Sequence, residues 1–309
     1  MSEFEWIARY FAPLARGEGA AGLRDDVAEL DANGRLIATT DGLAETVHFL
    51  PEDPIDTVAR KLVRVNVSDI LCKGARPTEA LLTLGWSNNR SEAELARFAA
   101  ALGEDLSRWG ARLVGGDTLR SPGGLFLSMT LIGRCHDRGP IRRSGGRAGD
   151  ELWVTGVVGA GALGLRAVWR GETHGFAATY REPAVPPLET ADLVAEHASA
   201  AMDVSDGLLA DTAKLAGASG LGAELALDCA PFASEPVDLD DAFFQATGGD
   251  DYQILFAAGS SRSGDIQTHA DALGVKVSRI GRLTAERGLQ VTMGGKAVKL
   301  PASLGFEHS

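Results

Sequence analysis

The sequence predicts an α/β (α+β) protein with two domains. Strand-like and helix-like patterns alternate in both halves of the chain, as in folds that combine sheets with helices. The chain has 309 residues, which is enough for two buried cores. Between the halves, the segment RCHDRGPIRRSGGRAGD (134–150) is rich in glycine and arginine and has little hydrophobic periodicity. We therefore expect one domain at 1–137 and a second at 138–309.

The first half should begin with a helix at 3–16, a glycine-bearing loop at 17–24 and a hairpin. The hairpin turn is expected at Asn33-Gly34, because Asn-Gly suits the tight turns that join antiparallel strands. A long helix should then run from 57 to 73, and a strand should follow at 80–86.

The next helix has its own start and stop signals. Ser91 and Glu94 fit a capping box, apolar residues then recur at spacings of three and four, and Gly110 ends the pattern. Strands at 111–116 and 125–134 are expected to bracket a turn, GGDT.

The second half repeats the alternation of strands and helices. The expected order is a buried strand in ELWVTGVV, a helix in GALGLRAVWRG, a short strand in AMDV, a helix in SDGLLADTAKLAGASG, a strand in YQILFAA and a closing hairpin in GLQVTMGGKAVKL.

Composition and charge exclude several classes of protein. The net charge is −12 and no dense basic run offsets it, which argues against nucleic-acid binding. Cys72, Cys135 and Cys229 are widely separated, so neither a zinc motif nor a disulfide framework is indicated. The start, MSEFEWIARY, does not resemble a secretory signal, and no apolar run is long enough to span a membrane. We expect a cytoplasmic protein.

Two acidic residues are paired by the expected hairpin. A turn at Asn33-Gly34 places Asp26 opposite Asp41 at the open end. Directly opposed like charges destabilise a sheet, so this register favours a cation between the two carboxylates. The alternative is that the strand ends diverge and both side chains are solvated.

A third acidic residue lies on the helix 57–73. Apolar residues recur there at helical spacing, and the same stripe continues to Asp69. A buried carboxylate must be paired or bind metal. Lys73, one turn further on, offers an ordinary ion-pair partner, so the two interpretations stay open.

Aspartates also recur beside glycines at expected strand ends, at positions 41, 117, 203 and 250. In AMDVSDGLLAD (201–211), Ser205 is a candidate N-cap, and an acidic first turn suits the helix dipole, but capping leaves Asp203 without a role. Oxygen ligands without cysteine or histidine suit magnesium. The pattern as a whole favours a magnesium-phosphate site over capping.

One motif competes with that interpretation. Gly159, Gly161 and Gly164 form a G-x-G-x-x-G at the entry to a helix, which is the dinucleotide-binding pattern in its usual context. No acidic residue ends a following strand at the expected distance, however, because THGFAATYREPAVPP does not resemble a strand. We favour close packing of helix and strand over NAD binding.

The ordered motifs resemble those of the thiamine-monophosphate kinase family, in the aminoimidazole ribonucleotide synthetase-like superfamily. The blocks are DDVAEL, TTDGLAETVHF, VNVSDILCKGARP, LVGGDT, RRSGGRAGD, MDVSDGL and GGDDYQILF, and the closing GFEHS also fits. The resemblance implies ATP-dependent phosphorylation of thiamine monophosphate to thiamine diphosphate with release of ADP. It also implies a homodimer in which an N-terminal ATP- and metal-binding sheet pairs into a barrel, followed by a C-terminal α/β domain.

The resemblance further implies roles for individual residues. Several Mg²⁺ ions would be held by Asp26, Thr40, Asp41, Asp69, Asp117, Asp203 and Asp206. ATP would contact Gly116, Asp117, Arg143 and Ser205. Thiamine monophosphate would contact His48, Asp250 and Phe306.

The sequence departs from the family pattern at three positions. Arg24 stands where the family usually has glycine, and Asp250 and Gln253 stand where it usually has glutamate. His48 and Phe306 also have ordinary packing interpretations, at a strand end and near the terminus. The rivals within the superfamily are aminoimidazole ribonucleotide synthetase, selenophosphate synthetase and the hydrogenase-maturation dehydratase. The chain lacks the early reactive cysteine expected of the second and the C-terminal cysteine expected of the third. A non-catalytic metal-nucleotide sensor remains an alternative outside the enzymes.

Overall fold

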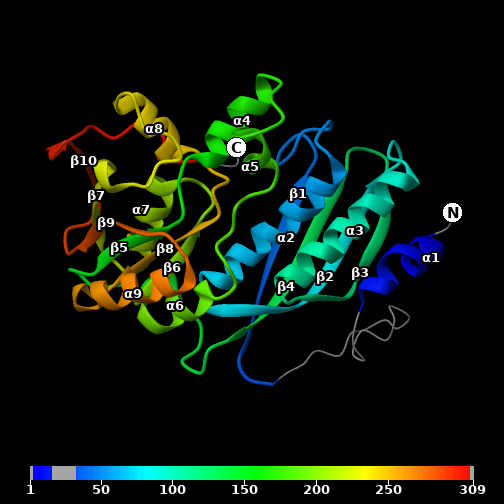
Figure 1. Cartoon of the computed structure of the whole chain (residues 1–309), viewed down its shortest axis with the longest axis horizontal. Helices are drawn as coiled ribbons and strands as arrows, with labels where there is room; N and C mark the ends of the chain where they lie inside the picture. The colour runs from blue at the N-terminus through cyan, green and yellow to red at the C-terminus, as the bar shows by residue number, and fades with distance from the viewer. Residues whose placement is uncertain (1–2, 16–32, 307–309) are drawn as a thin grey trace. The chain divides into compact units, whose positions relative to one another are not determined.

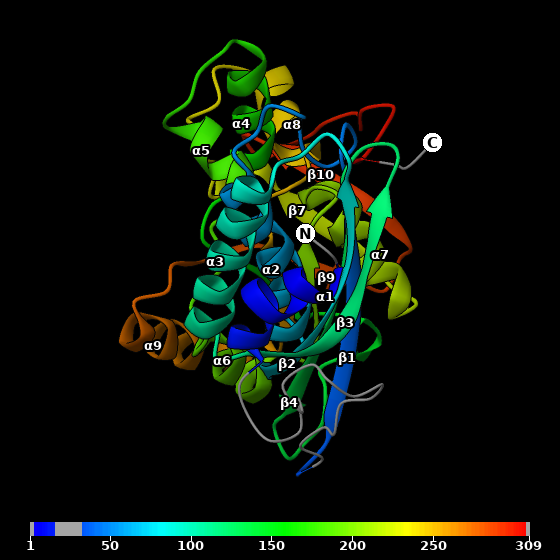
Figure 2. The ribbon, with the colours of Figure 1, turned by 90° about the vertical axis from the view of Figure 1, so that its right-hand side faces the viewer.

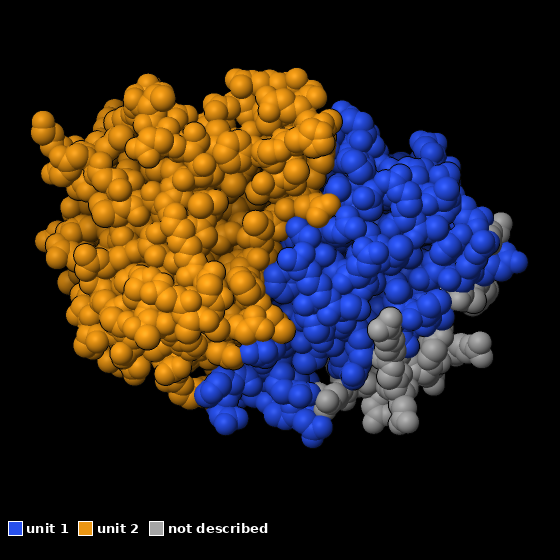
Figure 3. All heavy atoms as spheres, in the orientation of Figure 1, with its two compact units in different colours: residues 1–70, 76–137 blue, residues 71–75, 138–309 orange. Residues whose placement is uncertain are grey.

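The computed structural model describes residues 3–15 and 33–306, and the chain divides into two compact units (Figure 3). Unit 1 comprises residues 1–70 and 76–137, and unit 2 comprises residues 71–75 and 138–309. Each unit has its own sheet. The predicted α/β class is confirmed, and both sheets are open.

Unit 1 contains, within its described residues, a four-stranded sheet in the order β1-β4-β2-β3 (Figure 1). Strands β1 and β4 are antiparallel, and β2 and β3 are parallel. The elements are α1 (Glu3–Trp6), β1 (Leu36–Ala44), α2 (Ile55–Leu71), β2 (Ala75–Ser87), α3 (Glu92–Arg108), β3 (Arg112–Ser121) and β4 (Phe126–Cys135).

Helices α2 and α3 cover one face of this sheet (Figure 2). The predicted stripe on α2 is buried, and Val58, Leu62 and Val65 have at most 2% of their surface exposed. Arg64 is also buried, and its Nε donates to Asp105 Oδ2 on α3 at 2.8 Å. This ion pair compensates for the burial of two charges and fixes one helix against the other.

Helix α3 begins and ends as predicted. The Ser91 side chain accepts from the Glu94 N–H, and the Glu94 side chain accepts from the Ser91 N–H. Gly110 has a φ of 72°, which glycine adopts without strain. The predicted turn at GGDT is wrong, because these residues lie inside β3, where Asp117 pairs with Thr83. The chain turns instead after Ser121, at PGG.

The N-terminal helix was predicted at 3–16, and helical structure extends from Glu3 to Leu14, with a wider π-helical turn from Ile7 to Phe11. Strand β1 forms as the second arm of the expected hairpin and pairs along its length with β4. The first arm, with Asp26 and the loop at 17–24, lies outside the described residues.

Unit 2 contains, among its described residues, a seven-stranded mixed sheet in the order β11-β10-β7-β9-β5-β8-β6. The strands are β5 (Glu151–Thr155), β6 (Ala200–Val204), β7 (Gly222–Ala226), β8 (Gln253–Ala258), β9 (Val277–Thr284), β10 (Gly288–Met293) and β11 (Lys296–Ala297). The helices are α4 (Ala160–Trp169), α5 (Phe176–Arg181), α6 (Thr190–His197), α7 (Leu208–Ala218), α8 (Leu239–Thr247) and α9 (Ser263–Leu273).

The core of unit 2 lies between the sheet and its helices. Leu152, Met202 and Leu255 from three neighbouring strands pack with Leu208 and Leu215 of α7, and each is at most 1% exposed. This packing fixes β6 and the start of α7, which carry the AMDVSDG motif. None of the described helices is long and apolar enough to cross a membrane.

Candidate functional site

In unit 1, Asp41 on β1 and Asp69 on α2 lie near each other. Strand alternation directs Thr39 and Asp41 to the helix-covered face. Thr39 Oγ1 donates to Asp69 Oδ2 at 2.5 Å, and the Asp41 N–H donates to Asn66 Oδ1 at 3.1 Å. Strand and helix are therefore joined through polar side chains at the point where the two carboxylates meet.

This arrangement is electrostatically costly without a cation. The pKa of Asp41 is raised to about 7. Burial is the larger cause, and the negative charge of Asp69 is the second. A bound divalent cation would relieve both effects, because it replaces lost hydration and separates two like charges. The donor atoms are hard oxygens, which fit magnesium.

Thr40 and Asp117 lie elsewhere in unit 1. The Thr40 side chain points to the opposite sheet face from Asp41, where its Oγ1 donates to the Met129 carbonyl at 3.1 Å. Asp117 is exposed on β3, the edge strand opposite β1, and pairs with Thr83. Asp41 and Asp117 are both inside strands, so their predicted placement at strand ends is wrong.

Gly116 is required by the backbone itself. Its φ is 153°, and an added Cβ would lie 1.9 Å from the Leu82 carbonyl oxygen on β2. Any side chain at this position would break the pairing of β2 with β3. The predicted contact between Gly116 and ATP is therefore accompanied by a structural requirement for glycine.

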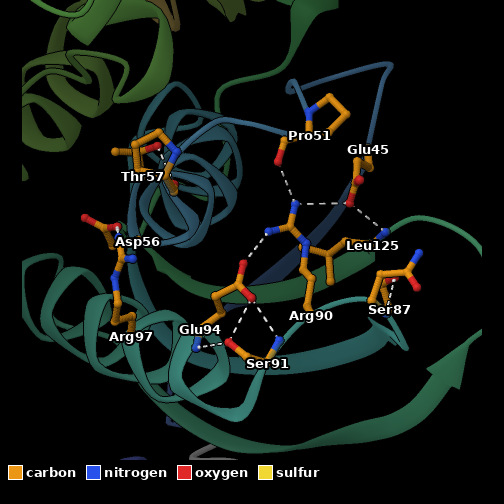
Figure 4. Close-up of polar contacts among 12 residues, drawn as sticks. Glu45, Pro51, Asp56, Thr57, Ser87, Arg90, Ser91, Glu94, Arg97 and Leu125 are labelled. Carbon is orange, nitrogen blue, oxygen red and sulfur yellow. Dashed lines mark hydrogen bonds and ion pairs between the residues drawn. The ribbon is translucent and has the colours of Figure 1, made fainter.

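His48 lies in the turn that follows β1. Its Nδ1 accepts from the Ala44 N–H at 3.0 Å, so the ring proton of a neutral His48 is on Nε2. The turn is held by Arg90, whose guanidinium donates to Glu45, to Glu94 and to the Pro51 carbonyl (Figure 4). His48 thus has the strand-end packing role that the sequence suggested, which leaves Nε2 as the nitrogen that can donate.

In unit 2, the loop between β6 and α7 is organised by Asp211. Its Oδ2 accepts from the N–H groups of Ser205, Asp206 and Gly207 at 3.0, 3.0 and 3.2 Å. The prediction that Ser205 caps the helix is wrong, because the N-cap residue is Gly207, with a φ of 119°. Sequence reasoning did not single out Asp211, although an aspartate at the fourth position of a helix is a recognisable signal.

Asp203 and Asp206, which lie next to this loop and in it, differ in burial and in their partners. Asp203 is buried on β6, and one of its carboxylate oxygens lies within 4.8 Å of Cys72 Sγ. Asp206 is more exposed and forms an ion pair with Lys214. Lys73, the alternative partner for Asp69, donates from its Nζ to the Ala201 carbonyl at 2.7 Å.

The same loop gathers Asp250 and Phe306. The Asp250 N–H donates to the Ser205 carbonyl, and the Phe306 N–H donates to the Asp206 carbonyl, each at 2.9 Å. Asp250 has a φ of 69°, and its Oδ1 accepts from the Tyr252 hydroxyl at 2.8 Å. The Phe306 side chain is 53% exposed. Asp250 and Phe306 are therefore both hydrogen-bonded to this loop, at Ser205 and at Asp206.

Arg143 lies at the other end of α7. Its carbonyl accepts from Ser219 Oγ at 3.0 Å, and Ser219 follows the last residue of the helix. The helix has 11 residues, so Arg143 and Ser205 are separated by roughly 16 Å along its axis.

Backbone N–H groups of the G-x-G-x-x-G motif donate to a carboxylate of the same chain. Asp251 accepts from the Gly159 N–H at 2.6 Å and from the Gly161 N–H at 3.0 Å. A Cβ on Gly161 would lie 2.3 Å from the Gly249 carbonyl oxygen, and one on Gly164 would lie 2.3 Å from that of Phe176. The packing interpretation accounts for this motif, because the N–H groups that would bind a pyrophosphate are used internally.

Gln253 also has an internal role. Its Oε1 accepts from the Thr155 hydroxyl at 3.0 Å, and its Nε2 donates to the Ala184 carbonyl. These contacts fix the strand after the GGDDY motif. The departure from glutamate at this position is accommodated by a complete set of buried hydrogen bonds.

At the N-termini of α7 and α4, backbone N–H groups donate to the carboxylates of Asp211 and Asp251 respectively. Both carboxylates are buried, and the N–H groups that donate to them are not available to a phosphate. Bound metal cations would let anionic substrates bind near the remaining acidic residues, as in metal-assisted chemistry on phosphates.

Comparison with known proteins gives the following matches. Residues 23–135 match the family model "AIR synthase related protein, N-terminal domain", and residues 147–294 match its C-terminal domain. A thiamine-monophosphate kinase from Caulobacter vibrioides is 38% identical over 322 residues, which covers 99% of this chain and 91% of that protein.

Solved structures of the same kind are also similar. Thiamine-monophosphate kinase from Stenotrophomonas maltophilia K279a matches with a TM-score of 0.80 at 31% identity, covering 94% of this chain and 98% of that one. AaThiL complexed with AMPPCP and TMP matches with a TM-score of 0.75 at 27% identity, covering 87% of this chain and 86% of that one.

Proposed function

The chain belongs to the AIR synthase related family, among the thiamine-monophosphate kinases, and we propose that it phosphorylates thiamine monophosphate with ATP. The products are thiamine diphosphate and ADP. The observation that carries this conclusion is the similarity to a kinase of that name over 99% of the chain. The related AaThiL complex with AMPPCP and TMP supports the same pair of substrates.

The acidic residues fit a reaction between two phosphate groups. Phosphoryl transfer needs positioning and charge neutralisation more than covalent participation by the protein. We infer that Asp26, Thr40, Asp41, Asp69, Asp117, Asp203 and Asp206 hold several Mg²⁺ ions. Bound magnesium would supply charge neutralisation and in-line alignment of the two substrates.

The chain's own residues support this role in each unit. Thr39 orients the Asp69 carboxylate through a hydrogen bond, and Asn66 holds the backbone of Asp41. Asp211 fixes the loop that carries Ser205 and Asp206. These contacts hold the carboxylates in place before substrates arrive, which lowers the cost of organising the site.

We also propose contacts for each of the two substrates. ATP would contact Gly116, Asp117, Arg143 and Ser205. The backbones of Arg143 and Ser205 lie at opposite ends of α7, so these two contacts would be to different parts of the nucleotide. Thiamine monophosphate would contact His48 through Nε2–H, the Asp250 carboxylate and the exposed Phe306 ring. An aromatic face suits the flat rings of thiamine, of which the thiazolium is cationic.

We also infer a homodimer formed through the sheet of unit 1. No described helix of unit 1 covers the face that carries Leu119 and Phe126, which are 45% and 48% exposed. Strands β1 and β3 are the edges of the described sheet and lie roughly 14 Å apart at about 4.8 Å per strand spacing. Closing two such sheets into a barrel would cover the apolar face and both edges.

Within this proposal, residues 1–137 form the domain for metal binding and dimerisation, and residues 138–309 form the C-terminal α/β domain. We also infer a cytoplasmic location, because the phosphoryl donor is ATP.

The test is an ADP-release assay with Mg²⁺, ATP and three acceptors, namely thiamine, thiamine monophosphate and aminoimidazole precursors. We expect turnover with thiamine monophosphate and none with thiamine. Turnover of thiamine but not of its monophosphate would overturn the assignment, and binding of both ligands without ADP release would indicate a sensor.

A further inference from the structure

Two histidines and a glutamate converge in unit 2, on the helices α6 and α9. His197 Nε2 lies 3.1 Å from His269 Nδ1, and His269 Nδ1 lies 3.6 Å from Glu196 Oε2. The three potential ligand atoms all lie within 4.8 Å of one another. The rings of His197 and His269 meet edge to face, with their centroids 5.3 Å apart.

The two shorter of these separations are close to the edge length of a metal coordination tetrahedron. Zinc binds imidazole nitrogen and carboxylate oxygen at about 2.0–2.2 Å, so two ligands of one ion lie roughly 3.3–3.5 Å apart. The measured values of 3.1 and 3.6 Å lie on either side of that range. Small side-chain movements would therefore admit an ion at the centre of the three atoms.

Either histidine can donate the shared proton, and in one of the two tautomers the cluster keeps two electron-rich atoms opposed. When His197 Nε2 donates to His269 Nδ1, the accepting nitrogen also faces the Glu196 carboxylate, and two electron-rich atoms remain opposed. A cation at the centre accepts a lone pair from each of the three atoms. His197 Nδ1 is buried without a hydrogen-bond partner among the described residues, so the polar contact of this ring is on the Nε2 side.

We propose that Glu196, His197 and His269 form a zinc site that joins α6 to α9. Two imidazole nitrogens and a carboxylate favour Zn²⁺ over Mg²⁺, because magnesium prefers oxygen ligands. The Glu196 side chain is 60% exposed, so an ion has access from solvent and its fourth position is open to water.

The local charges suit this occupant. Burial lowers the pKa of His197, which keeps the imidazole neutral and able to bind metal. Glu196 and Asp265 act on His197 as negative charges, and His269 and Arg262 act as positive ones. Asp265 also lies one turn before His269 on the same face of α9.

The test is calorimetric titration of the full-length protein with Zn²⁺ in a large excess of Mg²⁺, which occupies the carboxylate sites. We expect one Zn²⁺ per chain. His269→Gln should weaken binding by about 100-fold or more, and Glu196→Gln, at an exposed position, should weaken it by about tenfold. His174→Gln is the matched control, because His174 is an exposed histidine outside the cluster.

Two further measurements keep the test decisive. Zn²⁺ should raise the melting temperature of wild type and His174→Gln but not of His269→Gln. Co²⁺ should give the visible absorption of a low-coordinate site in wild type and His174→Gln but not in His269→Gln. If wild type binds no Zn²⁺ above the Mg²⁺ background, or if His269→Gln binds it equally well, the proposal is overturned and the two histidines form only a direct hydrogen bond.

Discussion

Asp41 on β1 and Asp69 on α2 lie so close that the charge of Asp69 helps to raise the pKa of Asp41 to about 7. Burial is the larger cause, and both effects oppose ionisation of Asp41. The metal-free protein therefore keeps a proton on Asp41, or has two repelling carboxylates there, at a position that we propose as a metal ligand.

The first prediction is the pH dependence of the metal-free protein. The folded-state pKa of Asp41 is raised above the unfolded value of 3.8, so the folded state binds more protons between about pH 4 and pH 7. Its contribution to stability is complete below pH 4 and is lost as the pH rises through 7. Chemical denaturation across this range should show that loss in wild type and a smaller one in Asp41→Asn.

The control for this measurement is Asp137→Asn, at an exposed position of the same unit. Its pH profile should follow that of wild type. If Asp41→Asn and wild type have the same profile between pH 4 and pH 7, Asp41 is not the group that titrates there.

The second prediction separates the two proposed substrate contacts. Phe306→Ala should raise the KM for thiamine monophosphate about tenfold and leave the melting temperature unchanged, because the ring is 53% exposed. His48→Ala should raise the same KM but also lower stability, because the Ala44 N–H loses its acceptor. The KM for ATP should stay nearly constant in both. Equal changes in the two KM values would indicate a folding role instead.

The third prediction concerns Asp251. Asp251→Asn should destabilise the protein by about 1–3 kcal/mol, because the amide NH₂ replaces one of the two carboxylate oxygens and cannot accept from the Gly159 or Gly161 N–H that it then faces. NAD should not raise the melting temperature of wild type, because this carboxylate already fills the dinucleotide motif. A clear rise with NAD would show that Asp251 can be displaced by a pyrophosphate.

The sequence predicted those elements whose signals are local. The Ser91–Glu94 capping box and Gly110 fix α3 within one residue at each end. Strand β9 (VSRIGRLT) was not predicted, because polar residues interrupt its apolar pattern, yet it lies between β7 and β5 in the sheet. Its position depends on pairing with strands far away in sequence, which local propensity does not encode.

The same difference between local signals and tertiary contacts applies to the residues of the candidate site. Motif spacing indicated Asp41 and Asp69, but not the Thr39 and Asn66 contacts that bring strand and helix together. The turn at GGDT was misplaced because glycine and aspartate favour turns, whereas Gly116 is needed for close approach to Leu82. Asp211 was read as part of an acidic stretch, and only tertiary structure shows that it accepts three N–H groups.

The fourth prediction is the oligomeric state. Light scattering at micromolar concentration should give a dimer, and Leu119→Lys should shift it to a monomer by placing a charge on the uncovered sheet face. Val237→Lys is the control, because Val237 is 87% exposed and lies in unit 2. A monomeric wild type, or dimers lost equally in both variants, would count against the barrel.

The last prediction returns to Asp41 and concerns metal. Asp41→Asn removes repulsion with Asp69 and also removes a proposed ligand, so the metal-free variant should be as stable as wild type or slightly more stable at neutral pH. The rise in melting temperature with Mg²⁺ and a nucleotide should shrink, because that rise follows affinity. Activity should fall by roughly 100-fold or more, because the ligand acts most strongly on the transition state. Thr39→Val, which removes only the hydrogen bond to Asp69, should cause a smaller loss. An Asp41→Asn protein that was markedly unstable without metal, yet bound Mg-nucleotide normally, would show that Asp41 is a structural residue.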